Sequence, residues 1–279
     1  MQSAEGRGTI LEDSCTAHVE LKNITKYYRY PFGDVIALKS VSFDVHAGEF
    51  IAIIGPKGSG KSTLINIIGC METPTSGFLR ILDTDLISID EKELDKFRLE
   101  NISLISPLLR LNPQKSLRQI LQDRLIFKYP SSCSQEKILF SLTKAGVPQS
   151  YWEIPTEELT EEMKLRGSIA RALVTDPTIL ILDEPLKKID TSSMLEVLVL
   201  LKVLNNQGIT IIIATEDPII ARRANRQLWL HEGSLMEDKR VKTDGRFVSD
   251  DSTFHRNGLI RTQGFDTIRY SGRSTLNPE

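Results

Sequence analysis

The feature that most constrains the fold of this chain is a glycine-rich segment, GPKGSGKST, at residues 55–63. It follows the apolar run FIAII (50–54) and leads into KSTLINIIG (61–69), whose apolar residues recur at helical spacing. The segment fits the pattern G-x-x-x-x-G-K-[ST], which binds phosphate when a strand precedes it and a helix follows. Its glycines let successive backbone N–H groups face an anion at the positive end of the helix. The sequence therefore predicts a phosphate-binding loop.

This loop supplies most of the candidate nucleotide ligands. Lys61 would reach the β- and γ-phosphates, and the Ser62 hydroxyl would be a ligand of Mg²⁺. Lys57 is an unusual additional cation inside the loop. The loop residues expected at the nucleotide are Gly55, Lys57, Gly58, Ser59, Gly60, Lys61, Ser62 and Thr63. A glycine-rich turn without a ligand is the alternative, and the strand–helix context argues against it.

A second motif, ILILDEP (179–185), brings acidic residues to the end of an apolar run. Asp183 is placed to hold Mg²⁺ through water, and Glu184 would orient or deprotonate an attacking water. Two acids that only cap a strand end are the alternative interpretation. Because a phosphate-binding loop lies upstream, we favour the functional one. The two motifs together predict binding of ATP with Mg²⁺, whereas hydrolysis is a separate question.

The alternation of strand-like and helix-like segments predicts an α/β fold. TILILDEP (178–185) and ITIIIATEDP (209–218) have apolar cores typical of parallel strands, and each enters a loop at acidic residues. In such sheets the sites lie at the carboxyl ends of the strands. Residues from about 86 to 175 are expected to be mostly helical. Further strands are expected in HVELKNITKYY (18–28), VSFDV (41–45) and GFLRIL (77–82), and a terminal hairpin in RQLWLHEGSLME with its turn at Glu232–Gly233.

The overall composition excludes several functional classes. The formal net charge of −2 gives no electrostatic footprint for nucleic acid, so no nucleic-acid partner is expected. The longest apolar runs are strand-sized, well below the roughly 20 residues that cross a bilayer. The N-terminal segment has neither a basic nor an apolar stretch, so we expect no secretory signal. Three widely spaced cysteines indicate a reduced, cytosolic setting without a cysteine metal site.

The order of the motifs resembles one family. A phosphate-binding loop, a helical insert, the pattern R-x-x-I-A-R-A-L (166–173) and LDEP follow one another as in the nucleotide-binding domain of ATP-binding-cassette (ABC) transporters. Within that family the chain is similar to the lipoprotein-release and macrolide-export type. The resemblance implies an α/β P-loop NTPase fold of ABC type, with a mixed sheet core, an antiparallel β subdomain and a helical subdomain. The segments expected are an N-terminal extension (1–16), the ATP-binding domain (17–236), its helical insert (about 99–175) and a polar C-terminal tail (237–279).

The same resemblance implies ligands and partners. Tyr28 would stack on the adenine, although a tyrosine at a strand end is more often only packed. Two such domains would clamp ATP head to tail, as a homodimer or as a heterodimer with another ABC ATP-binding subunit. Each nucleotide would lie between the P-loop of one subunit and the signature helix of the other. The clamp would drive an integral membrane permease subunit, which puts the chain in the cytoplasm, peripheral on the inner face of the cell membrane.

The family signature, Leu-Ser-Gly-Gly-Gln, is altered in this chain. Residues 159–163 read LTEEM, so Thr160 replaces the serine, Glu161 and Glu162 replace the glycines, and Met163 replaces the glutamine. Thr160 is a good N-cap, and acids in the first turn stabilise a helix by about 0.3–1 kcal/mol each. The same charges oppose a triphosphate by about 4 kcal/mol per unit pair at about 4 Å and a dielectric near 20, and by less when the side chains swing away. We therefore expect a well-capped helix whose own acids occupy the N-terminal position where the family binds phosphate.

Two further family positions are altered. Pro107 stands at the Q-loop glutamine and offers no side-chain oxygen to Mg²⁺ or water. Glu216 stands at the switch histidine, where a carboxylate would repel the γ-phosphate. We therefore expect an ATP-binding transport or lipoprotein-release subunit with weak or absent hydrolysis. The rivals are a fully active ABC transport ATPase and a soluble ABC protein in repair or translation. The second rival is disfavoured because the chain has no tandem cassette and no long coiled coil.

Overall fold

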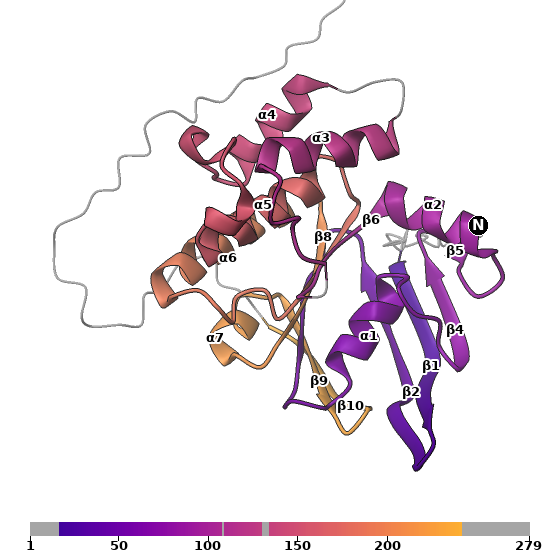
Figure 1. Ribbon diagram of the computed structural model, residues 1–279. Coiled ribbons are helices and arrows are strands. Elements are labelled where there is room, and N and C mark those ends of the chain that lie inside the picture. Colours follow the sequence, from indigo (N-terminus) through magenta and orange to yellow (C-terminus); the bar gives the residue numbers. More distant parts are fainter. Residues whose placement is uncertain (1–16, 108, 130–133, 242–279) are drawn as a thin grey trace, which may run out of the picture. The chain divides into compact units, whose positions relative to one another are not determined.

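Two β-sheets and the helices around them form the scaffold of the computed structural model, which describes residues 17–107, 109–129 and 134–241 (Figure 1). The expected N-terminal extension and nearly all of the expected tail lie outside the described residues. Most of the chain break expected at YPSSCS also lies outside them.

The larger sheet carries the phosphate-binding loop. Its strand order is β10-β9-β3-β8-β7-β6, and all neighbours are parallel except the β9–β10 hairpin. Its strands are β3 (Phe50–Ile54), β6 (Ile102–Ile105), β7 (Ile179–Asp183), β8 (Thr210–Thr215), β9 (Arg226–His231) and β10 (Ser234–Arg240). Every residue of β3, β7 and β8 is buried, as expected for strands covered on both faces. The mixed sheet core predicted from the sequence is confirmed.

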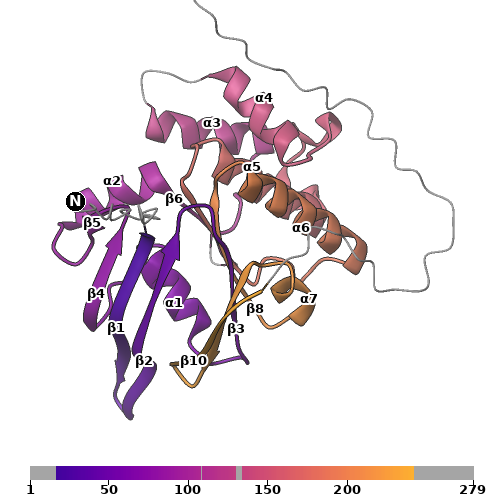
Figure 2. The same cartoon turned by 180° about the vertical axis from the view of Figure 1, so that it is seen from behind.

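The smaller sheet is antiparallel and has the order β2-β1-β4-β5. Its strands are β1 (Ala17–Tyr30), β2 (Gly33–His46), β4 (Ser76–Ile81) and β5 (Thr84–Asp85). Helix α1 (Lys61–Ile68) lies between the two sheets in both views of the ribbon (Figures 1 and 2). Alternation along β3 explains this arrangement, because Ile51 and Ile53 join the core around α1, while Phe50 and Ala52 face the other core.

The second core is built by helices that cover the opposite face of the larger sheet. These helices are α3 (Leu117–Lys128), α4 (Gln135–Lys144), α5 (Glu161–Leu173), α6 (Thr191–Asn206) and α7 (Pro218–Ala221). Helix α2 (Glu91–Asn101) and the short turns η1 (Gln149–Tyr151) and η2 (Thr156–Glu158) complete the described elements. None of the described helices combines the length and the apolar composition needed to span a bilayer.

The structure can be compared with three predicted boundaries: the terminal hairpin, the helical segment and the domain end. The hairpin predicted at Glu232–Gly233 is confirmed, and both turn residues have positive φ (45° and 79°), as a two-residue hairpin requires. The segment from 86 to 175 is not helical throughout, because residues 102–105 form β6 beside β7; a short apolar run does not reveal its period. The domain end expected at residue 236 falls inside β10, which stays paired with β9 up to Arg240.

Candidate nucleotide-binding site

The phosphate-binding loop joins β3 to α1 and is fixed by two glycines. Gly60 precedes α1 with φ 102°, and a Cβ there would lie 2.4 Å from the Ala37 carbonyl oxygen. A Cβ on Gly55 would lie 2.1 Å from the Leu230 carbonyl oxygen. Both positions therefore require glycine because of space, and Gly60 also because of its left-handed backbone. The predicted strand–loop–helix context is present.

Lys61, the first residue of α1, turns back into the loop. Its Nζ atom donates to the carbonyl oxygens of Gly55 (2.8 Å) and Pro56 (3.1 Å). The same atom lies 3.6 Å from Oε1 of Glu184 and 3.5 Å from Oε1 of Glu216. With its side chain only 5% exposed, Lys61 is a buried ammonium surrounded by oxygen atoms. The structure thus places Lys61, the predicted phosphate ligand, beside the predicted catalytic residue Glu184 and beside Glu216, which stands at the altered switch position.

The two candidate metal ligands, Ser62 and Asp183, contact each other. The Ser62 hydroxyl donates to Oδ1 of Asp183 over 3.2 Å, which joins α1 to the end of β7. Burial raises the pKa of the Asp183 carboxyl, while the hydrogen bond from Ser62 and the charge of Lys61 oppose that rise. One hydroxyl and one carboxylate fit Mg²⁺, which keeps several waters and takes further ligands from phosphates. No group of three or more histidine, cysteine or acidic side chains that could hold a metal occurs among the described residues.

Glu184 sits in a strained and dry position. Its backbone has φ 45°, a left-handed value that a non-glycine residue seldom adopts. Burial raises the pKa of its carboxyl, and the charge of Lys61 opposes the rise. Within the described part of the chain, its Oε1 atom and the Ser59 hydroxyl are buried without a hydrogen-bond partner. Two unpaired polar atoms beside the loop are what a polar ligand would satisfy.

Tyr28 lies beside the first turn of α1. Its hydroxyl donates to Oε2 of Glu72 (2.6 Å) and lies 3.4 Å from Oγ1 of Thr63. Lys26 approaches the ring, with Nζ 5.3 Å from the centroid. Burial and the Glu72 carboxylate raise the pKa of the Tyr28 phenol. Sequence reasoning missed Glu72, which no motif marks because it belongs to the turn after α1.

The start of α5 does not present two free carboxylates. Thr160 caps the helix, because its hydroxyl accepts a hydrogen bond from the Met163 N–H (3.3 Å). Glu161 is 47% exposed, with Lys164 at 3.2 Å and Lys188 at 3.8 Å from its oxygens. At the helix start Thr160 and Glu161 are exposed, whereas Glu162 and Met163 are half-buried. The neutralising lysines were not part of the sequence prediction.

Glu162 turns the other way, into the protein. Its Oε1 accepts from Nε of Arg166 (2.7 Å), and its Oε2 accepts from the Ser193 hydroxyl (2.9 Å). The Ser193 hydroxyl also contacts Asp190, the N-cap of α6 (2.8 Å). Arg166 is buried and reaches Glu196 of α6 as well. Glu162 therefore ties α5 to α6, a role that the signature comparison could not reveal.

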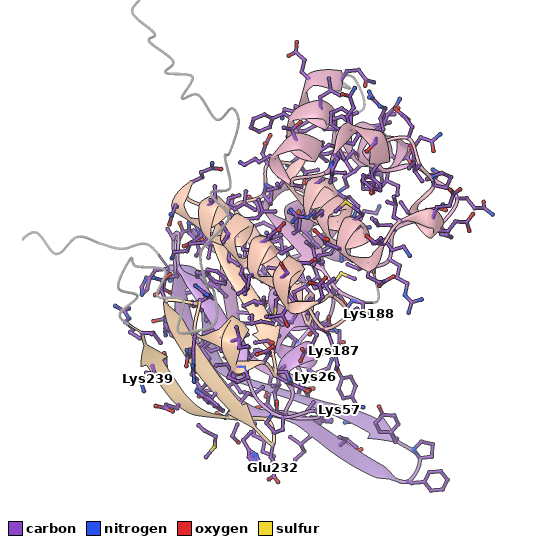
Figure 3. The ribbon with its side chains drawn as sticks, turned by 90° about the vertical axis from the view of Figure 1, so that its left-hand side faces the viewer. Lys26, Lys57, Lys187, Lys188, Glu232 and Lys239 are labelled. Carbon is purple, nitrogen blue, oxygen red and sulfur yellow. The ribbon has the colours of Figure 1, made fainter. Side chains whose placement is uncertain are left out.

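The other sequence-predicted residues lie at the surface. Lys57 is exposed on the loop, on the face that also carries Lys187 and Lys188 (Figure 3). Pro107 is exposed in the turn after β6, and its carbonyl oxygen accepts from Nε of Arg110 (3.3 Å). Burial raises the pKa of the Glu184 carboxyl, and the charge of Lys187, like that of Lys61, opposes the rise. Among the described residues, neither Lys57 nor Pro107 takes part in the hydrogen bonds and ion pairs of the Lys61 ammonium group.

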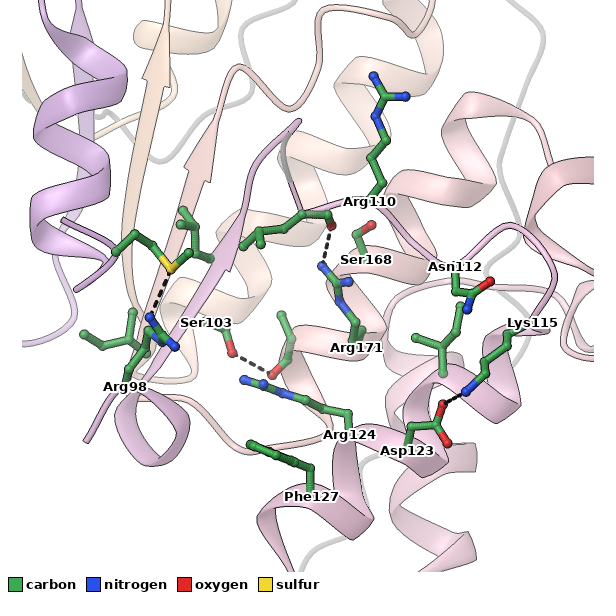
Figure 4. Close-up of a pocket in the computed structure, with 16 residues that line it drawn as sticks. Arg98, Ser103, Arg110, Asn112, Lys115, Asp123, Arg124, Phe127, Ser168 and Arg171 are labelled. Atoms are coloured by element: carbon green, nitrogen blue, oxygen red, sulfur yellow. Dashed lines mark hydrogen bonds and ion pairs between the residues drawn. The ribbon is translucent and has the colours of Figure 1, made fainter. Parts of the chain in front are cut away.

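A separate groove of about 530 Å³ opens between α2, β6, α3 and α5 (Figure 4). Its lining includes five cationic side chains: Arg98, Arg110, Lys115, Arg124 and Arg171. One acid shares the groove, Asp123, and it is bound to Lys115 at 2.6 Å. Burial and the charge of Arg98 lower the pKa of Arg124, and burial and Arg124 do the same to Arg171. The groove thus holds a positive charge that its own residues leave partly uncompensated.

The family profile described as ABC transporter matches residues 38–187 of the sequence. The chain belongs to the ABC transporter family. This ABC domain is 36% identical to the uncharacterized ABC transporter ATP-binding protein YvrO of Bacillus subtilis, over 79% of the chain and 96% of that protein. It is 34% identical to the macrolide export ATP-binding/permease protein MacB of Salmonella typhimurium, over 80% of the chain and 34% of MacB.

Solved structures agree with this assignment. The dimeric structure of MJ0796, a bacterial ABC transporter cassette, superposes with a TM-score of 0.75 at 33% identity, over 80% of this chain and 98% of that one. MJ0796 is an uncharacterized ABC transporter ATP-binding protein of Methanocaldococcus jannaschii. A second MJ0796 structure, in a post-hydrolysis dimeric state with ADP and phosphate, matches equally well. The predicted family, the predicted similarity to the macrolide-export type and the P-loop fold are confirmed, and this chain is an ATP-binding subunit of the ABC transporter class.

Proposed function

We propose that this chain binds Mg-ATP as the nucleotide-binding subunit of a membrane transport or lipoprotein-release complex, and that it hydrolyses ATP slowly or not at all. The observation that carries the proposal is the surroundings of Lys61. The loop geometry and the Ser62–Asp183 contact suit a magnesium nucleotide. Mg²⁺ would neutralise charge on the phosphates as the reaction proceeds. Lys61 and the loop N–H groups would hold the phosphates.

Slow hydrolysis is supported by the residues that would act on water. Glu184 would be the base, and its buried Oε1 has the dry surroundings that raise a carboxyl pKa. It shares Lys61 with Glu216, which would stand where a γ-phosphate needs a donor. Pro107, exposed after β6, supplies no side-chain oxygen or N–H. The proposed site therefore lacks two of the polar groups that orient water and phosphate.

The proposed partner is an integral membrane permease subunit that docks in the cationic groove of Figure 4. The groove offers uncompensated arginines and an apolar rim that includes Phe127, which is exposed. MacB, by its name, joins an ATP-binding and a permease part, which supports a membrane partner for this chain too. Such a partner would hold the chain in the cytoplasm on the inner face of the membrane. The dimeric MJ0796 structures support pairing with a second cassette, identical or different.

The proposal is tested with the purified chain and with its membrane complex. Equilibrium binding of ATP is measured with and without Mg²⁺, together with steady-state turnover. We expect ATP binding that Lys61→Ala abolishes, and turnover close to background. Retained binding in Lys61→Ala would overturn the nucleotide site. Robust turnover that disappears in Glu184→Gln would overturn slow hydrolysis and favour the active transport ATPase.

A further inference from the structure

The ammonium group of Lys61 is already surrounded by four oxygen atoms of the protein. A lysine offers three N–H donors, and two of them go to the carbonyl oxygens of Gly55 and Pro56. The third faces two carboxylates, those of Glu216 at 3.5 Å and Glu184 at 3.6 Å. Two negative charges therefore meet one positive charge in a place where the lysine is almost wholly buried.

The backbone around Glu216 is fixed at the end of β8. Glu216 follows β8 directly, and the residues on both sides of it are fixed by hydrogen bonds. The Asp217 N–H donates to the Thr215 hydroxyl (3.0 Å), and the Asp217 carboxylate caps α7 by accepting from the Ile219 N–H (2.7 Å). Glu216 also lines a pocket of about 280 Å³ together with Glu184. These contacts fix the backbone after β8, and from there the Glu216 carboxylate faces Lys61 at 3.5 Å.

We propose that Glu216 determines which nucleotide the site prefers, because its carboxylate competes with the terminal phosphate of a triphosphate for Lys61. The P-loop lysine contacts the β- and γ-phosphates of a bound nucleotide. A diphosphate needs this contact only at its β-phosphate, whereas a triphosphate brings further negative charge toward Glu184 and Glu216. The preferred ligand class is therefore nucleoside diphosphates. The inference rests on the proposed nucleotide site and specifies its ligand.

The exposure of the Glu216 side chain limits how much its charge can change triphosphate affinity. Glu216 is 39% exposed, so its side chain can partly turn away when a triphosphate binds. Solvent also screens the repulsion, which lowers it well below the value of a buried pair. We expect removal of the charge to strengthen triphosphate binding about tenfold, a change of about 1.4 kcal/mol. The change for a diphosphate should stay below about threefold, because no γ-phosphate approaches Glu216.

The experiment compares two ligands on three forms of the full chain. Dissociation constants of Mg-ADP and of a magnesium ATP analogue with a nitrogen bridge between the β- and γ-phosphates are measured by calorimetry. The forms are wild type, Glu216→Gln and the control Glu232→Gln. Glu232 is an exposed acid in the hairpin turn, where Gly233 donates its N–H to the Ser59 carbonyl oxygen (2.9 Å). Its removal takes the same charge from beside the loop without a contact to Lys61. Glu216→His serves as a second variant if Glu216→Gln unfolds.

The expected result is that wild type binds ADP at least as tightly as the triphosphate, and that Glu216→Gln or Glu216→His reverses this order. Equal changes for both ligands, or no change, would overturn the inference while leaving the proposed nucleotide site intact. An equal effect of Glu232→Gln would also overturn it, because general charge would then be the cause. Binding of neither nucleotide by any form would overturn the proposed function together with the inference.

Discussion

Glu162, in the first turn of α5, accepts a hydrogen bond of 2.9 Å from Ser193, in the first turn of α6. Its other oxygen accepts from the buried Arg166 over 2.7 Å. One of the two acids at the altered signature is therefore a structural link between two helices. The other, Glu161, remains on the surface with 47% of its side chain exposed. The two neighbours should respond differently to mutation.

The first prediction concerns stability. Glu162→Ala leaves the buried guanidinium of Arg166 with one carboxylate fewer, so the free energy of unfolding should fall by about 1–3 kcal/mol. Urea denaturation followed by circular dichroism measures the change. Glu161→Ala is the matched control and should change stability by no more than about 0.5 kcal/mol, as surface substitutions do. Equal losses in the two variants would contradict the inward role of Glu162.

The second prediction concerns dimerisation with ATP. Both oxygens of Glu162 are hydrogen-bonded, to Arg166 and Ser193. The more exposed Glu161 is therefore the acid that would oppose a phosphate from a second subunit. Two unit charges about 4 Å apart in water interact by about 1 kcal/mol. Glu161→Gln should therefore strengthen ATP-dependent dimerisation a few-fold, and Glu162→Gln should not. Sedimentation velocity with and without Mg-ATP measures this, and a larger effect of Glu162→Gln would refute the assignment.

The third prediction tests the adenine contact of Tyr28. Loss of an aromatic side chain under a base costs about 1–3 kcal/mol, so Tyr28→Ala should weaken ATP binding at least about fivefold. Tyr28→Phe keeps the ring and removes only the hydroxyl that donates to Glu72, so it should change affinity much less. Tyr27→Ala is the neighbouring control. Equal ATP affinities of the Tyr28→Ala and Tyr27→Ala forms would show that Tyr28 only packs.

The fourth prediction tests the groove. Arg124 lies in it, and no hydrogen bond or ion pair of its guanidinium occurs in the described part of the chain, so an acidic segment of a partner would meet an available charge. Arg124→Glu should strongly reduce recovery of the membrane subunit when the complex is purified by affinity. Lys96→Glu makes the same charge change at an exposed position on α2 and should leave recovery unchanged. Unchanged recovery with Arg124→Glu would place the partner elsewhere.

The sequence alone determined the parts of this protein that depend on neighbours along the chain. The loop GPKGSGKST is recognisable because a strand, its glycines, a lysine and a helix start follow one another directly. The same holds for Asp183, the last residue of β7, and for Glu184, which follows it. The terminal hairpin was predictable from Glu232–Gly233 for the same reason. Strand β6 was missed, because four residues with three apolar side chains do not define a period.

The tertiary structure decided which charges meet. The pattern LTEEM gave no indication that Glu162 points inward, since its partner Ser193 lies 31 residues later on another helix. The sequence likewise could not show that Glu216 reaches Lys61. Nor could it show that Arg98, Arg124 and Arg171 share one groove. Local patterns follow from backbone geometry over one or two turns, whereas these contacts follow from how strands and helices pack. A carboxylate at an altered family position therefore acquires its role only when the fold supplies its partner.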